Sequence, residues 1–217
     1  MLARLYISPS SGAAYSSKKL LYEAARERDP SITLKDVDLW LSRRKSYQLQ
    51  RVPKRKRDIY FRPYRFSPIP GSTIILDTMD LSSVKGSSVK YAIIVLCGWS
   101  RYLSVILLKQ IQSKNVARKF DEVLSTYPWN LYGRSGRYIY CDYGVEFRGK
   151  FEEYCRSKGI KIYRTSPKYS PLFKTSFAEV VIGTLRRLLS RIYLDDPKLR
   201  FYPRMKKAIL SYNNRKN

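Results

Sequence analysis

The chain has 217 residues, an apolar content of 44% and a net charge of +26 from 43 Lys and Arg against 17 Asp and Glu. This length and apolar content exclude a wholly disordered chain and predict one domain of catalytic size plus a small accessory module. The charge predicts a polyanionic partner, which points first to nucleic acid. A basic viral or ribosomal structural protein would have the same charge, so charge alone does not separate the two classes.

Missing residue types narrow the chemistry further. There is no histidine, which excludes Ser-His-Asp and Cys-His nucleophile systems and zinc sites that use histidine. The cysteines Cys97, Cys141 and Cys155 are widely spaced and odd in number, which argues against a disulfide framework and suits a reducing cytosolic or nuclear compartment. No run reaches the about 18 apolar residues of a membrane span, and the N-terminus lacks a signal-peptide pattern, so we expect no membrane association.

Residues 1–50 are predicted to form a small helical module. The serine pair at 16–17 can cap a helix over 18–26, and Thr33 with Asp36 three residues later can start a second helix. Two short helices around a tight break are compatible with a helix-turn-helix that binds DNA. The alternative is a helical cap that only packs on the next domain.

Residues 51–71 are expected to be a linker. Its prolines prevent regular structure, and residues 54–57 place four cations in a row. Aromatic residues between the cations could stack on bases, and the basic run is typical of a nuclear-import signal.

From residue 72 the hydrophobic pattern predicts alternating strands and helices. The strands are expected at 73–77, 90–97, 101–108, 137–141 and 160–165. The helices are expected from Ser113 as cap, over 147–159, from 175 or 176, and over about 202–212. Three strands in a meander followed by crossover helices predict an α/β domain over 72–217 with a mixed five-stranded sheet flanked by helices. This is the element order of the ribonuclease H-like fold.

Acidic residues are scarce, so their positions are informative. Asp77 is expected to end the first strand, Asp142 follows the fourth strand, and Glu179 lies near the start of a helix. Three convergent carboxylates suit Mg²⁺ or Mn²⁺, and two such ions about 3.5–4 Å apart would support phosphoryl transfer without histidine. Each acid alone could instead cap a turn or a helix. Asp80 is the rival to Asp77, although we expect it beyond the end of the strand.

The segment at 141–147 resembles the D-x-G-x-E-F box of retroviral-type integrases, in which Asp142 matches the second catalytic acid. Glu179 stands 37 positions later and Asp77 65 positions earlier, close to the spacings of the other two acids in that family. Ser100-Arg101 is similar to the S-R of the family's second hairpin. The resemblance implies a DDE-type integrase or transposase in which these three acids bind the metal ions.

Within this family, the chain resembles the integrases of Maverick/Polinton and related virus-like elements. Their N-terminal and C-terminal motifs resemble the segments 5–9, 36–41, 47–49, 174–179, 184–186 and 212–214. The His/Cys zinc module of retroviral integrases is absent, so no zinc is expected. After Glu179, where relatives often have polar residues, the chain has an apolar run that ends in Gly183.

The resemblance also assigns DNA contacts. Lys168 and Lys174 precede the catalytic helix, where the family contacts DNA ends. Arg186 matches a DNA-contacting cation of the family, and Arg187 adjoins it. A solvated basic loop is the alternative for the two lysines. Glu146 belongs to the box but is no metal ligand in the family, so we expect a supporting or DNA-facing role.

The sequence therefore predicts a metal-dependent DNA integrase that processes 3′ ends and joins element or viral DNA to target DNA. Two Mg²⁺ or Mn²⁺ ions per site, a homo-oligomer on DNA, and the host nucleus (or, for a viral protein, the virion or cytoplasm) follow from the resemblance. Two alternatives stay open: a decayed or domesticated integrase that only binds DNA, and a ribonuclease H-like nuclease that cuts without joining.

Overall fold

The computed structural model describes residues 1–49, 69–126, 128–131, 137–164 and 175–214. The chain divides into two compact units. The helical unit comprises Met1–Ile59 with Gly183–Asn217, and the sheet unit comprises Tyr60–Ile182. None of the described helices has both the length and the apolar character needed to cross a membrane. Most of the expected linker lies outside the described residues.

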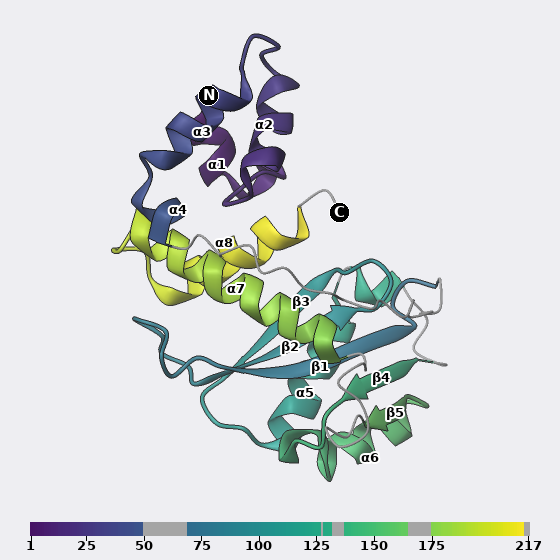
Figure 1. The fold of residues 1–217 in the computed structure, drawn as a ribbon. Coiled ribbons are helices and arrows are strands. Elements are labelled where there is room, and N and C mark those ends of the chain that lie inside the picture. Colours follow the sequence, from purple (N-terminus) through teal and green to yellow (C-terminus); the bar gives the residue numbers. More distant parts are fainter. Residues whose placement is uncertain (50–68, 127, 132–136, 165–174, 215–217) are drawn as a thin grey trace. The chain divides into compact units, whose positions relative to one another are not determined.

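The sheet unit is built on a five-stranded mixed sheet in the order β3-β2-β1-β4-β5 (Figure 1). Its strands are β1 (Thr73–Asp80), β2 (Tyr91–Cys97), β3 (Leu103–Leu108), β4 (Tyr138–Cys141) and β5 (Lys161–Arg164). The first three form an antiparallel meander, and β4 and β5 add to β1 in parallel. The predicted α/β class and mixed sheet are thereby confirmed.

Two helices, α5 (Ser113–Leu124) and α6 (Lys150–Ser157), lie on one face of this sheet (Figure 1). The start of α5 differs from the prediction, because Gln112 is the capping residue and makes no side-chain capping bond. The expected helix from Phe147 is also interrupted: η3 (Val145–Phe147) is a 3-10 turn that precedes α6. Gly159, which we expected to end this helix, has a φ of +65° that suits glycine.

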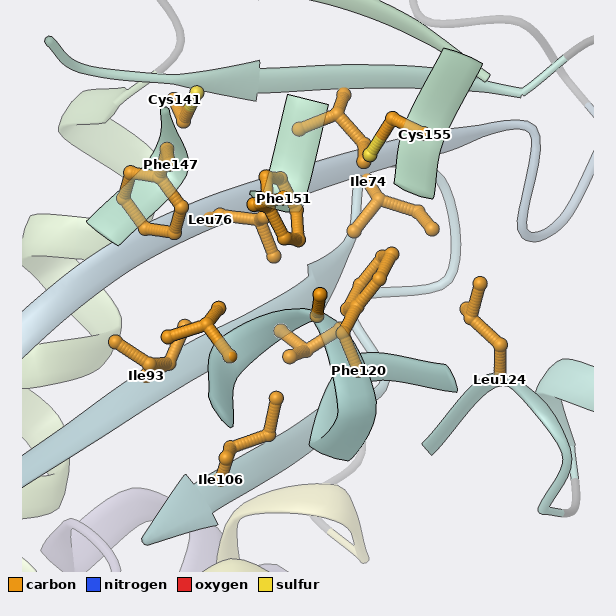
Figure 2. Packing of buried hydrophobic residues seen from close by; sticks show 14 of the residues in the cluster. Ile74, Leu76, Ile93, Ile106, Phe120, Leu124, Cys141, Phe147, Phe151 and Cys155 are labelled. Carbon is orange, nitrogen blue, oxygen red and sulfur yellow. The ribbon is translucent and has the colours of Figure 1, made fainter. Parts of the chain in front are cut away.

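The face toward α5 and α6 is closed by a continuous apolar core, shown in Figure 2, and is called the packed face below. Alternate residues of β1, Ile74 and Leu76, point into it because side chains alternate along a strand. Phe120 of α5 meets Phe151 of α6 with ring centroids 5.4 Å apart. All four side chains are fully buried, so this core stabilises the sheet and the two helices that cover it.

The other residues of β1 point to the opposite face, which we call the acidic face. Ile75 on this face is buried although it lies outside the packed cluster. Ala178 and Val181 are buried on α7 (Thr175–Asp195), whose first residues belong to the sheet unit. Asp77 has the same strand parity as Ile75, so it is placed on the acidic face.

The helical unit begins with the N-terminal segment that the sequence predicted to be helical. It contains α1 (Leu2–Ile7), η1 (Pro9–Ser11), α2 (Lys18–Arg26), α3 (Leu34–Ser42), α4 (Lys45–Leu49) and α8 (Phe201–Asn213). The Ser17 hydroxyl accepts the Leu20 N–H at the start of α2. Thr33 and Asp36 form the expected capping box at the start of α3. These caps confirm the predicted helix starts.

The last part of the chain belongs to the helical unit rather than to the sheet unit. Asp195 at the end of α7 pairs with Arg44 at 2.9 Å, and the Asn214 side-chain amide donates to the Pro9 carbonyl oxygen at 3.0 Å. Gly12, with a φ of +69°, allows this approach because a Cβ there would lie 3.0 Å from the Asn214 oxygen. The compact units therefore divide the chain differently from the domain predicted over 72–217, because residues from Gly183 onward belong to the helical unit. The sequence did not indicate this, since contacts between distant segments leave no local pattern.

Candidate active site

Asp77 lies inside β1 and not at its end. The strand continues to Asp80, because Thr78, Met79 and Asp80 still pair with β2. The expectation that Asp77 ends the strand and that Asp80 lies beyond it is therefore wrong. The Asp80 carboxylate accepts the Ser82 N–H at 2.7 Å in the turn that follows, whereas Asp77 is half-buried on the acidic face.

Asp142 directly follows the end of β4, as predicted. In the parallel register Ile75 of β1 stands opposite Tyr140 of β4. Two residues further along each strand are Asp77 and Asp142, so the register brings these two carboxylates to the same level of the sheet. The Asp142 Oδ1 accepts the Gly144 N–H at 2.9 Å, which fixes its side chain at the start of a turn.

Glu179 is an exposed residue near the start of α7. The negative charge of Glu179 nevertheless affects the pKa of Asp77. The pKa of Asp77 is raised to about 6, chiefly by burial and in smaller part by the charges of Asp142, Glu179 and Glu146. The Thr78 N–H, which donates to the Asp77 carboxylate, acts in the opposite direction. Two of the acids singled out in the sequence, Asp142 and Glu179, thus act electrostatically on the third, Asp77.

Glu146 is the fourth acid of this group, and its position was missed at the sequence level. Only 6% of the residue is exposed, and the Thr78 hydroxyl donates to its carboxylate. A Cβ at Gly144 would lie 2.6 Å from Glu146 Oε2, so glycine leaves room for this carboxylate. The available signal in the sequence was the aromatic residue that follows, Phe147, which the structure buries in the packed core.

In the part of the chain that the structure describes, no cation pairs with the carboxylates of this group. No ion pair with Asp77, Asp142 or Glu179 occurs among the described residues, in a chain whose net charge is +26. Carboxylate oxygens that repel one another fit hard divalent cations. Within the described ranges, however, no three acidic or cysteine side chains are close enough together to hold an ion as they stand. The carboxylate oxygens are therefore of the type that binds Mg²⁺ or Mn²⁺, but in this structure they lie too far apart to share one ion.

The predicted DNA-contacting cations divide into two pairs. Lys168 and Lys174 lie outside the described residues. Arg186 and Arg187 lie on α7 in the segment that belongs to the helical unit. Arg186 is exposed, whereas Arg187 is half-buried and donates to the Thr184 hydroxyl at 3.1 Å. Burial, followed by the charge of Arg191, lowers the pKa of Arg187.

No protein-family model and no curated protein matches the chain. Solved structures of retroviral integrases are similar to it. The magnesium complex of the HTLV-2 integrase catalytic core, in its trimeric form, has a TM-score of 0.50 and 23% identity, covering 65% of this chain and 84% of that one. The simian T-cell lymphotropic virus intasome with PP2A regulatory subunit B56 gamma has a TM-score of 0.56 and 17% identity, covering 89% of this chain and 67% of that one. At these identities the likeness establishes the ribonuclease H-like fold.

Proposed function

We propose that the protein is a DNA integrase or transposase that processes the 3′ ends of element or viral DNA and joins them to target DNA. The observation that carries this proposal is the parallel pairing of β1 with β4, which would bring Asp77 and Asp142 to the same level of the sheet. The charges of Asp142 and Glu179, which contribute to the raised pKa of Asp77, support it. The similarity to retroviral integrase cores supports it. The motifs shared with Maverick/Polinton integrases make an element of that kind our proposed source.

Asp77, Asp142 and Glu179 would hold two Mg²⁺ or Mn²⁺ ions, which when bound would activate the attacking oxygen and stabilise the leaving oxygen. The chain's own contribution is to orient the ligands. The Gly144 N–H holds the Asp142 carboxylate, and the Thr78 hydroxyl holds Glu146 beside the group. In end processing, a water oxygen bonds to phosphorus and the bond to the 3′ oxygen breaks. In joining, the freed 3′-hydroxyl forms the new ester while a target phosphodiester bond breaks.

DNA would be held through its phosphates. A net charge of +26 supplies strong, salt-dependent affinity for a polyanion. We assign phosphate contacts to Arg186, Arg187, Lys168 and Lys174, and a DNA contact to the helices of the N-terminal segment. Joining two ends requires them to be handled together, so we propose a homo-oligomer on DNA in the host nucleus, or in the virion or cytoplasm for a viral protein.

The test is a strand-transfer assay with Mg²⁺ or Mn²⁺ that compares the wild type with Asp142→Asn and Glu179→Gln. Asp80→Asn is the matched control, because it removes an acid three residues from Asp77 that is used in a turn. We expect a loss of about 100- to 1000-fold in the first two variants, the scale of one electrostatic group removed from an active site, and near-normal activity in the control.

The other outcomes separate the alternatives. Full activity in Asp142→Asn and Glu179→Gln would refute the assignment of the acids. An inactive wild type with tight, salt-dependent DNA binding would identify a decayed integrase that only binds DNA. Cutting without joining would identify a nuclease.

A further inference from the structure

The hairpin between β2 and β3 contains an unusual backbone conformation at Arg101. Its φ is +59°, in the left-handed region that favours glycine, and its N–H donates to the Cys97 carbonyl oxygen at 3.1 Å to close the turn. A non-glycine residue in this region is strained. An arginine at a position that suits glycine indicates that its side chain has a role.

The Arg101 side chain contacts the start of α7. Its guanidinium carbon lies 3.9 Å from the centroid of the Phe177 ring. This is well inside the roughly 6 Å limit of a cation–π contact. Both side chains are half-buried and both residues belong to the sheet unit, so the contact is partly shielded from water.

Phe177 stands two residues before Glu179 in the first turns of α7. Helix starts fray readily, because the first N–H groups have no partner within the helix. Gly183, four residues after Glu179, weakens the same helix further. Besides the Arg101 contact, burial of Ala178 and Val181 anchors this segment. The direction in which Glu179 projects therefore depends on how firmly these turns are held.

We propose that Arg101 is a positioning residue, which holds the first turns of α7 through Phe177 so that Glu179 faces Asp77 and Asp142. The proposal rests on the function proposed above and gives a physical role to the Ser100-Arg101 pair. In this role Arg101 acts through Phe177 and does not itself contact the metal ions. Its loss changes the position of Glu179 and not the binding of DNA.

The test uses Arg101→Gly, which removes the side chain at a position where glycine relieves backbone strain, and Phe177→Leu, which removes the ring but keeps an apolar group. Two quantities are measured in full-length protein: the Mn²⁺ affinity without DNA, by isothermal titration, and amide hydrogen exchange at residues 177–180. We expect each variant to weaken Mn²⁺ binding about 5- to 20-fold, the scale of a lost cation–π contact, and to speed exchange in this segment. The double variant is expected to bind Mn²⁺ no more weakly than either single variant. Arg101→Lys is expected to keep most of the wild-type Mn²⁺ affinity.

Lys109→Ala is the matched control, since it removes one exposed cation just after β3, and it is expected to leave Mn²⁺ affinity unchanged. Wild-type Mn²⁺ affinity in Arg101→Gly would overturn the proposal while the proposed function stands. Weaker DNA binding with unchanged Mn²⁺ affinity would make Arg101 a phosphate contact and would also overturn it. A wild type that binds no Mn²⁺ and joins no DNA would defeat the proposed function itself.

Discussion

The two faces of the sheet have opposite character although the same strands form both. On the packed face, Ile74 and Leu76 meet α5 and α6 in a closed apolar core (Figure 2). One residue along the strand, on the acidic face, Asp77 is half-buried, and burial together with the like charges near it raises its pKa to about 6. Burial of apolar side chains on the packed face stabilises the fold, whereas burial of the ionised Asp77 on the acidic face destabilises it. Removing a buried ring from the packed face should therefore destabilise the protein, whereas removing the charge of Asp77 should stabilise it.

The largest effect is expected on the packed face from Phe120→Ala. Phe120 is fully buried against Phe151, and removing a buried aromatic ring costs about 3–5 kcal/mol through lost transfer free energy and a cavity. Urea denaturation of the wild type and the variant measures this loss. A loss below about 1 kcal/mol would show that the two faces do not differ as described.

On the acidic face, Asp77→Asn is expected to stabilise the metal-free protein at pH 8. The pKa of Asp77 in the folded state, about 6, is above its ordinary value of 3.8. The folded protein therefore binds more protons than the unfolded chain between these values, so the contribution of Asp77 to stability is full below about pH 3.8 and is lost as pH rises through about 6. Removing the charge should raise the free energy of unfolding by about 3 kcal/mol at pH 8, because the two pKa values differ by about 2 and each pKa unit corresponds to about 1.4 kcal/mol.

Thermal denaturation in a chelator at pH 8 and at pH 4 checks this expectation, since the difference should vanish at the lower pH. Asp80→Asn is the control and should bring no stabilisation, because the Asp80 carboxylate accepts the Ser82 N–H. A wild type more stable than Asp77→Asn at pH 8 would contradict the account.

A smaller effect is expected at the edge of the acidic group from Gly144→Ala. The added Cβ would lie 2.6 Å from Glu146 Oε2, so this carboxylate must move and weaken its bond to Thr78, at a cost of about 1 kcal/mol. In a Glu146→Ala background most of this cost should disappear. Equal costs in both backgrounds, measured by urea denaturation, would exclude the contact as the cause.

The smallest effect is expected on the solvent side of α5, from Glu122→Gln. Glu122 pairs with Arg118 one turn earlier, and both side chains are largely exposed. Exposed pairs of this kind contribute about 0.3–0.5 kcal/mol. If Glu122→Gln lowered the free energy of unfolding as much as Phe120→Ala in the same urea experiment, the size of these effects would not follow the burial of the side chains.

The sequence predicted the fold well where the pattern is local. The apolar strands, the caps at Ser17 and Thr33, and the position of Asp142 after β4 follow from residue type and spacing. The end of β1 was misplaced because Thr78 to Asp80 are held in the strand by pairing with β2, which local propensity does not reveal. For the same reason the contacts of Asn214 with Pro9 and of Arg101 with Phe177 could not be predicted.

The candidate site was predicted by residue type and not by geometry. Asp77, Asp142 and Glu179 could be chosen because acids are scarce in this chain and their spacing resembles a known family. The burial of Glu146 and its bond to Thr78 depend on how η3 packs against β1, which no spacing encodes. The roles of Lys168 and Lys174 stay predictions.

The most direct test of the central claim is anomalous diffraction from crystals of the full chain grown with Mn²⁺. We predict manganese peaks within coordination distance, about 2.0–2.2 Å, of carboxylate oxygens. These oxygens should belong to Asp77, Asp142 and Glu179. Peaks elsewhere on the protein, or a structure in which Glu179 points away from Asp77, would contradict the account.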